Sequence, residues 1–262
     1  MRNGFSLVEL SIVLVILGLL VGGILVGKSL IQASELRSVS QDITKVQTAI
    51  AAFRDKYFAY PGDMTNATAF WGKDAVNCNG NSGTAVTPGT CNGDGGSTYA
   101  GNEIYRFWDH LALAGLWPGN WPGVASIAAG QSVAGDNPGT NLPLSKYSRG
   151  NGNTGLGYRP RTYSAGGNDR WNSNENGTGL FVSSNLNPCC GAPFLDGGGI
   201  LVPDLLDLDI KIDDGMPGLG VMQIKYAYAG SCTTTNIAAT SNYQASWSTN
   251  KCPFYYDIGI RQ

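Results

Sequence analysis

An apolar run near the N-terminus constrains this chain more than any other feature. From Phe5 to Gly27 the sequence reads FSLVELSIVLVILGLLVGGILVG, in which Glu9 is the one charged side chain and sixteen residues are Leu, Ile, Val or Phe. As an α-helix this run would extend about 34 Å, which is enough to cross the hydrocarbon core of a bilayer. The run therefore predicts a transmembrane span.

Glu9 is the unusual residue of this span, because hydrocarbon offers a carboxylate no hydrogen-bond partner. Two plainer interpretations are that Glu9 lies among the lipid headgroups, at little cost, or that the segment is an ordinary secretory signal peptide. Against a signal peptide, the run is long, no A-x-A site follows it, and the helical pattern continues past Lys28. Glu9 is therefore a candidate functional residue that needs a cationic partner.

A second pattern follows the span and is typical of an amphipathic helix. Apolar residues recur at alternating steps of three and four, at Leu36, Val39, Ile43, Val46, Ile50, Phe53 and Tyr57. The opposite face is polar, and Pro61-Gly62 ends the pattern. One helix from Phe5 to about Phe58 would be about 80 Å long, so half of it must protrude from the rest of the protein.

The order of residues at the N-terminus resembles the prepilin-type cleavage and methylation segment of type IV pilins and type II secretion pseudopilins. A short basic leader, MRNG, ends at Gly4, the aromatic Phe5 follows, and Glu9 lies near the start of the apolar span. The resemblance implies that a membrane-bound prepilin peptidase cuts between Gly4 and Phe5 and methylates the new amino group of Phe5. It also implies that Glu9 pairs with the N-terminal amine of a neighbouring pilin during filament assembly.

Many members of this family have a helix-breaking proline midway along the segment. Here the corresponding stretch has four glycines instead, Gly18, Gly22, Gly23 and Gly27. Each glycine costs about 1 kcal/mol relative to alanine in a helix interior. We therefore expect the helix to loosen locally at these glycines when a filament assembles.

The implied organisation is a leader at residues 1–4, a transmembrane and assembly half-helix at 5–27, an amphipathic half-helix at 28–58 and a globular head at 59–262. The resemblance implies a single-pass inner-membrane protein with its head in the periplasm, which later enters a periplasmic pseudopilus or a cell-surface pilus with copies of itself or other pilins. Because the net charge is −2 and only 14% of residues are charged, we expect no nucleic-acid partner.

The head is expected to be an antiparallel sheet packed against the long helix, which gives an α+β, pilin-like fold. The strand candidates are residues 156–163, 179–183, 200–202, 221–228 and 254–260, separated by turn-rich segments. A short packed helix is expected within 106–119, where Phe107, Leu111 and Ala114 share a face. His110 in this helix is interpreted as a structural or exposed residue rather than a catalyst, because no acid or nucleophile is evidently paired with it.

Six cysteines and a single histidine do not give the usual ligand spacing of a zinc site. Disulfides in an oxidising compartment are the better interpretation, although six cysteines allow 15 pairings. Short turn-containing loops favour Cys78 with Cys91 and Cys232 with Cys252, and the second loop resembles the disulfide-bounded loop of many pilins. The pairing of the adjacent Cys189 and Cys190 stays open, because a disulfide between neighbouring residues is strained and free thiols are unusual outside the cell.

Aspartates gather in the segment 204–220 near a Gly-Pro turn, and some pseudopilins bind calcium in a loop near the C-terminus. Asp209, Asp213 and Asp214 are candidate calcium ligands, because carboxylates on a turn suit this ion. The alternative is that they are turn and cap residues with Lys211 as counter-ion, since a full alternating ligand series is missing.

A weaker calcium-like spacing occurs at Asn92, Asp94 and Glu103. There Ser97 stands where the sharp turn of a calcium loop favours glycine. We therefore rank this spacing below the aspartates of 204–220.

Catalytic signatures are missing from the sequence, which has no G-x-S-x-G, H-E-x-x-H or phosphate-cradling loop. The sequence therefore predicts a structural, self-assembling subunit and not an enzyme, and a membrane-tethered enzyme has little support. The alternative is a minor or tip pilin that acts as an adhesin or ligand-binding module. Its candidate contacts are the tryptophans Trp71, Trp108, Trp117, Trp121, Trp171 and Trp247.

Overall fold

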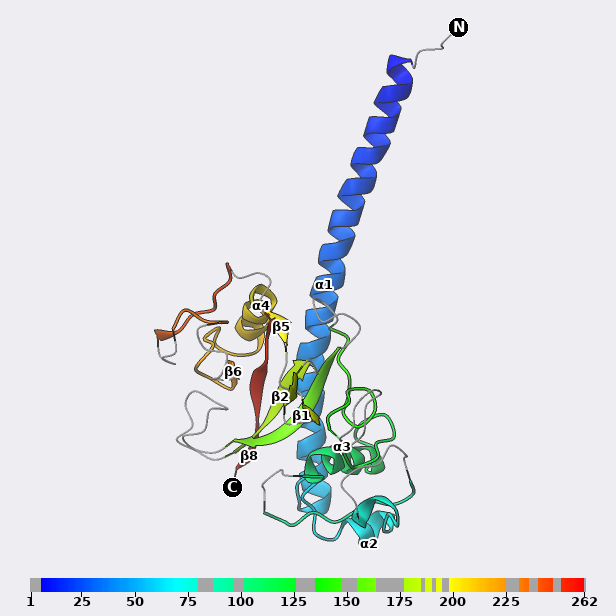
Figure 1. Ribbon diagram of the computed structural model, residues 1–262, viewed down its shortest axis with the longest axis vertical. Coiled ribbons are helices and arrows are strands. Elements are labelled where there is room, and N and C mark those ends of the chain that lie inside the picture. The colour runs from blue at the N-terminus through cyan, green and yellow to red at the C-terminus, as the bar shows by residue number, and fades with distance from the viewer. Residues whose placement is uncertain are drawn as a thin grey trace.

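The computed structural model describes residues 6–79, 87–96, 101–125, 135–147, 155–163, 177–184, 187–189, 192–194, 198–224, 231–235, 240–246 and 251–261. Its longest element is helix α1, Leu7–Tyr57, with 51 residues. Figure 1 shows the first half of α1 projecting alone, while its second half lies along the head. The prediction of one long helix with a protruding half is therefore confirmed.

The packed half of α1 uses the apolar stripe that the sequence shows. Its buried residues are Leu36, Val39, Ile43, Val46, Ala49, Ile50 and Phe53. Leu30 and Ile31 are still 66% and 63% exposed. Packing of α1 against the head therefore begins near Leu36 and not at residue 28, where the amphipathic half was expected to begin. The helix ends where Phe58 adopts a left-handed conformation with φ of 54°, and its amide donates to the carbonyl of Arg54 at 2.9 Å.

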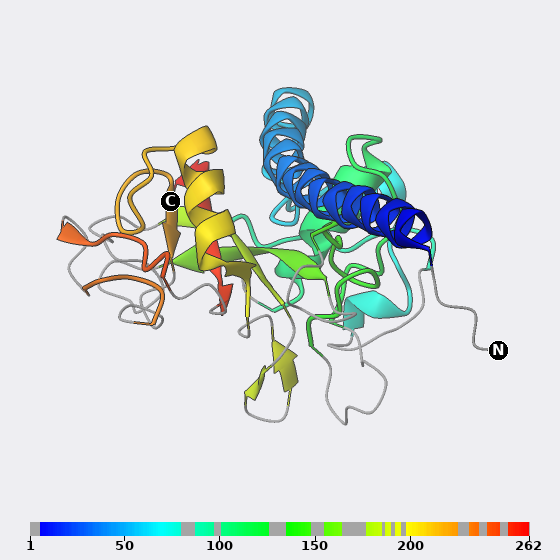
Figure 2. The same ribbon diagram turned by 90° about the horizontal axis from the view of Figure 1, so that it is seen from above.

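The main sheet has four antiparallel strands in the order β1-β2-β8-β6. They are β1, Leu156–Tyr163, β2, Gly177–Ser184, β8, Phe254–Arg261, and β6, Met222–Ile224. All eight residues of β2 are buried, as befits a strand with a neighbour on each side. The α+β class is confirmed, with the sheet to one side of α1 in the view of Figure 2.

Among the described residues, two short strand pairs lie outside this sheet. The predicted strand at 200–202 is β5, Ile200–Leu201, which pairs with β7, Lys251–Cys252. A further pair joins β3, Asn187–Cys189, to β4, Ala192–Phe194. The predicted strand at 221–228 is described only as β6, because residues 225–228 lie outside the described residues.

The described part of the head contains four further helical elements. They are α2, Ala67–Trp71, the 3₁₀ turn η1, Asn77–Asn79, α3, Glu103–Leu113, and α4, Val202–Ile212. Helix α3 ends before the Gly/Pro stop at 118–119, because Gly115 reverses the chain with φ of 74° and donates to the carbonyl of Ala112 at 2.9 Å.

Residues 204–212 belong to helix α4, which the sequence did not predict, whereas Asp213 is a cap residue as the alternative interpretation expected. Proline in the first turn is compatible with a helix start, and Val202, Leu205 and Leu208 are buried at steps of three. The turn begins only at Asp213, the C-cap residue of α4. One hydrophobic core joins the stripe of α1 to α3, α4 and the sheet.

Candidate functional site

The first half of α1 presents a continuous apolar surface that none of the described residues of the head covers. Its large apolar side chains between Leu7 and Ile31 are 51–85% exposed. Among the described residues, α1 is the one helix long and apolar enough to cross a membrane, with a mean hydropathy of 2.8 over a window that is 0% buried. Water-soluble monomers rarely expose such a surface, so lipid or another chain must cover it.

The carboxylate of Glu9 takes part in the N-terminal cap of α1. Its Oε2 accepts a hydrogen bond of 2.8 Å from the amide of Ser6, and Oγ of Ser6 accepts one of 3.3 Å from the amide of Val8. Together the two side chains form a capping box, which satisfies amides that a helix leaves unpaired at its start. The role of Ser6 was missed at the sequence level, although the S-x-x-E spacing signals it.

This cap lies beside the predicted cleavage point. The Ser6 amide that Glu9 accepts from belongs to the peptide that joins Ser6 to Phe5. The Glu9 carboxylate is therefore one peptide unit from the amine that cleavage after Gly4 would create. Gly4 and Phe5, the predicted cleavage and methylation residues, lie outside the described residues.

The four glycines of the apolar half do not interrupt the helix. Helix α1 is continuous through Gly18, Gly22, Gly23 and Gly27, and a Cβ added at any of them would meet no atom within 4 Å apart from the adjacent backbone of the helix itself. Within a single chain, none of these glycines serves a close contact with the head. The loosening expected on assembly stays a prediction.

Comparison with known families identifies the segment that begins this helix. Residues 1–25 match the family model described as the prokaryotic N-terminal methylation motif. This segment is a prepilin signal. The match includes the leader, both residues at the predicted cut and Glu9, and it supports a precursor of the type IV pilin-like or pseudopilin kind, a structural and not an enzymatic class. No curated protein and no solved structure matched the chain.

Behind the prepilin signal, two disulfides close loops of the head. One joins Cys78 to Cys91 across 13 residues, and the other joins Cys232 to Cys252 across 20 residues. These are the two pairs that short loops favour. The side chains of Cys189 and Cys190 lie outside the described residues, so their pairing stays open.

His110 is a buried structural residue that links two distant turns. Its Nδ1 accepts a hydrogen bond of 2.9 Å from the amide of Gly62, and its Nε2 lies 3.1 Å from the carbonyl oxygen of Cys91. A neutral ring that carries its proton on Nε2 satisfies both contacts. Burial is the main cause that lowers the pKa of His110 to about 4.

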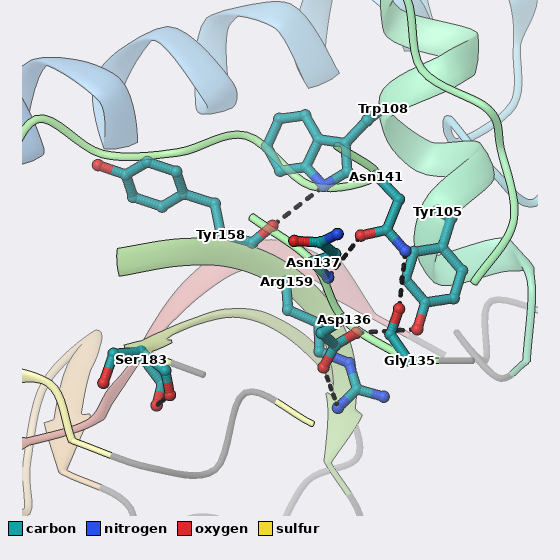
Figure 3. A network of polar contacts seen from close by, with 10 residues as sticks. Tyr105, Trp108, Gly135, Asp136, Asn137, Asn141, Tyr158, Arg159 and Ser183 are labelled. Atoms are coloured by element: carbon teal, nitrogen blue, oxygen red, sulfur yellow. Dashed lines mark hydrogen bonds and ion pairs between the residues drawn. The ribbon is translucent and has the colours of Figure 1, made fainter. Parts of the chain in front are cut away.

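A buried polar network fastens the loop before β1 to α3 and to β1 (Figure 3). Asp136 is fully buried, accepts a hydrogen bond of 2.9 Å from the Tyr105 hydroxyl and forms an ion pair of 3.2 Å with Arg159. Asn141 orders the same loop, because its Oδ1 accepts from the amide of Asn137 at 2.7 Å. Burying a charge is costly unless it is paired, and these contacts give the network a structural role.

Among the described residues of the head, two groups of carboxylates come together. Asp209, Asp213 and Asp214 each place one oxygen within 4.8 Å of the others. These three residues are the candidate calcium ligands predicted from the sequence, and they lie close together at the end of α4.

The second group consists of Asp63, Asp94 and Glu103 and differs from the spacing seen in the sequence. Oδ1 of Asn92 accepts a hydrogen bond of 2.9 Å from the amide of Thr68. The third member of the group is Asp63, which lies in the turn after α1. No local spacing in the sequence could have linked Asp63 with residues so far along the chain.

An open cavity of about 320 Å³ lies beside α3, and Thr87, Asp109, Asn120 and Trp121 are among its lining residues. Burial is the main cause that raises the pKa of Asp109 to about 7, and nearby Asp74 adds to the shift. The combination of an aromatic ring, an amide and a carboxyl group is able to stack on and hydrogen-bond a polar ligand.

The tryptophans proposed as surface contacts have different environments. Trp108 is fully buried and donates from Nε1 to the carbonyl oxygen of Tyr158 at 3.0 Å (Figure 3). Trp117 packs against Trp108 with ring centroids 5.1 Å apart. Trp108 therefore belongs to the core and not to a ligand surface, whereas Trp171 and Trp247 lie outside the described residues.

Proposed function

We propose that this chain is a self-assembling structural subunit of a type IV pilus or a type II secretion pseudopilus. One observation carries the proposal. A prepilin signal at the N-terminus leads into a single helix, α1, whose first half is apolar and exposed and whose second half packs on the head. The apolar half is covered by lipid in the inner membrane and afterwards by the same half of neighbouring subunits. The head is then displayed along a periplasmic or cell-surface filament.

In this proposal prepilin peptidase cuts between Gly4 and Phe5 and methylates Phe5. The Glu9 carboxylate, held in the precursor by the Ser6 amide at 2.8 Å, then pairs with the amine of a neighbouring subunit. An ion pair with a charged donor is stronger than a hydrogen bond from a neutral amide, above all in an apolar environment. Assembly therefore supplies the cationic partner that Glu9 requires.

Mass spectrometry of the protein purified from membranes tests the processing step. We expect the loss of residues 1–4 and one methyl group on Phe5. An intact Met1, or a cut after Gly27, would contradict the proposal.

Two substitutions of Glu9 test the assembly step, because glutamine keeps the capping hydrogen bond and alanine removes it. We expect both Glu9→Gln and Glu9→Ala to abolish filaments while the processed protein accumulates in the membrane. If Glu9→Gln assembles normally and only Glu9→Ala fails, Glu9 acts as a helix cap and not as a charge partner.

A second candidate function is a minor or tip pilin that binds a ligand through its head. The cavity lined by Asp109, Asn120 and Trp121 favours it. The test is cell adhesion by a strain that carries Trp121→Ala. Adhesion lost while filaments persist would support this role, and unchanged adhesion would remove the cavity as its site.

A further inference from the structure

The cavity beside α3 is formed by three segments of the head. They are the loop that the Cys78–Cys91 disulfide closes, helix α3, and the segment that follows α3. The lining residues include Thr87, Pro88, Asp109, Leu113, Asn120 and Trp121. The volume of about 320 Å³ is at the lower end of the range of about 300–1,000 Å³ for ligand pockets. It suits a ligand of the size of one small ring.

The indole of Trp121 is held in a fixed position at this cavity. Its Nε1 donates a hydrogen bond of 3.3 Å to the carbonyl oxygen of Pro118. Gly119, with φ of 105°, packs against the indole, because a Cβ at this residue would lie 3.1 Å from Cζ2 of Trp121. The Trp121 side chain is only half-buried. Since its N–H already has an acceptor, its accessible part offers a ligand an apolar π surface.

Two polar side chains at the cavity have hydrogen-bonding capacity that the described residues do not use. Oδ2 of Asp109 accepts a hydrogen bond from the Thr90 hydroxyl, but its Oδ1 accepts none from the described residues. The Asn120 side chain is exposed and forms no hydrogen bond within the described part of the chain. An amide group both donates and accepts, and a carboxylate oxygen accepts. Together they are able to bind neighbouring hydroxyl groups of one ligand.

The rim of the cavity from Thr87 to Thr90 is held in place before a ligand binds. The Thr87 hydroxyl donates to Oδ2 of Asp74 and accepts a hydrogen bond of 2.8 Å from Nδ2 of Asn77. The amide of Asp74 donates to the carbonyl oxygen of Thr90 at 3.0 Å, and the Cys78–Cys91 disulfide closes the loop. Because this rim is already ordered, a ligand loses little free energy in ordering it.

The chemistry of the cavity disfavours a charged ligand. Asp74 and Arg106 both act on the Asp109 carboxyl group, so the surroundings hold two acidic groups and one basic group and do not attract an anion. A quaternary ammonium ligand is typically held in a cage of several aromatic rings. Among the described lining residues Trp121 is the one aromatic side chain. A neutral ligand with an apolar face and a polar edge fits this combination better.

We propose that this cavity binds one neutral pyranose ring of a carbohydrate. A pyranose carries apolar C–H groups on its faces and hydroxyl groups around its edge. One face would stack on the Trp121 indole, with the exposed Leu113 beside it, and the hydroxyl groups would bind Asp109 and Asn120. The inference rests on the second candidate function, because it names the ligand class of that cavity, and it does not depend on filament assembly.

Binding of methyl pyranosides to the purified full-length protein tests the proposal. The probes are the methyl glycosides of glucose, galactose, mannose and N-acetylglucosamine, and binding is measured by saturation-transfer NMR at increasing ligand concentration. The protein is kept in a polyoxyethylene detergent, because its headgroup carries no sugar that could compete.

The chain offers a matched control for each cavity variant. Asn120→Ala is paired with Asn66→Ala, because Asn66 is also exposed and its side chain makes no capping hydrogen bond at α2. Trp121→Ala is paired with Phe70→Ala, because Phe70 is an aromatic residue that is 56% exposed and lies outside the cavity lining. The Tm of each variant shows whether it folds.

We expect at least one pyranoside to bind with a Kd of about 1–10 mM, as is usual for a small polar ligand in an open site. Trp121→Ala should weaken this binding at least about tenfold and Asn120→Ala about three- to tenfold. Asn66→Ala and Phe70→Ala should keep the wild-type Kd. If Trp121→Ala does not fold, Asn120→Ala decides alone, because it changes an exposed side chain.

The proposal is overturned if none of the four pyranosides binds, or if the cavity variants bind as tightly as their controls. It is also overturned if tetramethylammonium or adenosine binds more tightly than every pyranoside. Cell adhesion that is lost with Trp121→Ala, in a protein that binds no pyranoside, would support the second candidate function and show that this ligand class is wrong.

Discussion

The Tyr158 hydroxyl on β1 donates a hydrogen bond of 3.1 Å to Oδ2 of Asp42 on α1. This bond joins the long helix to the first strand of the sheet, and the Tyr158 side chain is buried. Burial raises the pKa of Asp42, while the Tyr158 bond and Lys45, 3.8 Å away, oppose the shift. The half-buried Asp42 carboxylate therefore depends on Tyr158 for a well-placed donor.

Tyr158→Phe should lower the free energy of unfolding by about 1–3 kcal/mol, because it leaves a partly buried charged acceptor without this donor. Urea denaturation of the full-length protein in detergent measures the effect. The control is a double-mutant cycle with Asp42→Ala. An equal loss from Tyr158→Phe in both backgrounds would mean that the bond itself contributes nothing.

His110 should make the head sensitive to acid. Its pKa is about 4 in the folded protein, below the usual 6.5. Between these two pH values the unfolded chain therefore binds a proton at His110 that the folded chain does not bind. The contribution is present above pH 6.5 and is lost as the pH falls towards 4, by at most about 3 kcal/mol. In unfolding measured at a series of pH values, His110→Gln should flatten this slope even if it lowers overall stability. A slope that is unchanged in the variant would exclude His110 as its cause.

Asp109 should give a slope of the opposite sign. Its pKa rises from 3.8 to about 7 on folding, so the folded state keeps a proton that the unfolded state loses. The resulting stability is complete below pH 3.8 and is lost as the pH rises through 7. Asp109→Asn should match the wild type near pH 4 and exceed its free energy of unfolding at pH 8 by up to about 4 kcal/mol.

The control for this experiment is Asp207→Asn, which removes an exposed carboxylate. It shows how much the loss of one negative charge alone changes the stability at each pH. If Asp109→Asn gains no stability at pH 8 relative to this control, the Asp109 carboxylate does not hold a proton in the folded protein.

The two disulfides should differ in how fast they are reduced in the folded protein. Cys232 and Cys252 are 1% and 0% exposed, whereas Cys78 is only half-buried. Thiol alkylation and mass spectrometry during mild reduction should find Cys78–Cys91 open first. The reverse order would show that the C-terminal loop opens before the N-terminal one.

Removing the C-terminal disulfide by the double substitution Cys232→Ala and Cys252→Ala should lower the free energy of unfolding by about 3 kcal/mol. The reason is that the bond restricts a loop of 20 residues in the unfolded chain. Urea denaturation of the variant under oxidising conditions measures the loss. A loss well below 1 kcal/mol would mean that the unfolded chain keeps this loop closed without the bond.

The parts of the fold that local pattern determines could be predicted from the sequence. The alternating steps from Leu36 to Tyr57 place one face of α1 in the core, and the β1 and β8 segments read as strands because their neighbours are turn-forming. The prepilin signal is likewise contained in a few consecutive residues. Each of these features is specified within a short stretch of chain.

What depends on distant contacts could not be predicted in the same way. The aspartates and the Gly-Pro turn of 204–220 obscured the helical spacing of Val202, Leu205 and Leu208, which becomes clear only once these residues have a core to enter. The pairing of β5 with β7 and the placing of Asp63 near Glu103 bring together residues far apart in the sequence. Such contacts leave no local signature.

The uncovered half of α1 has a consequence for how a subunit can travel. Its apolar side chains from Leu7 to Ile31 are exposed, and none of the described residues of the head covers them, so a freely dissolved chain would carry the full hydration penalty of this surface. In the function proposed above, a subunit therefore has no stage in which it diffuses through water between the bilayer and the filament. The same proposal requires filament growth at the lipid boundary, where the apolar half of α1 from a neighbouring subunit replaces each lipid acyl chain that leaves the helix.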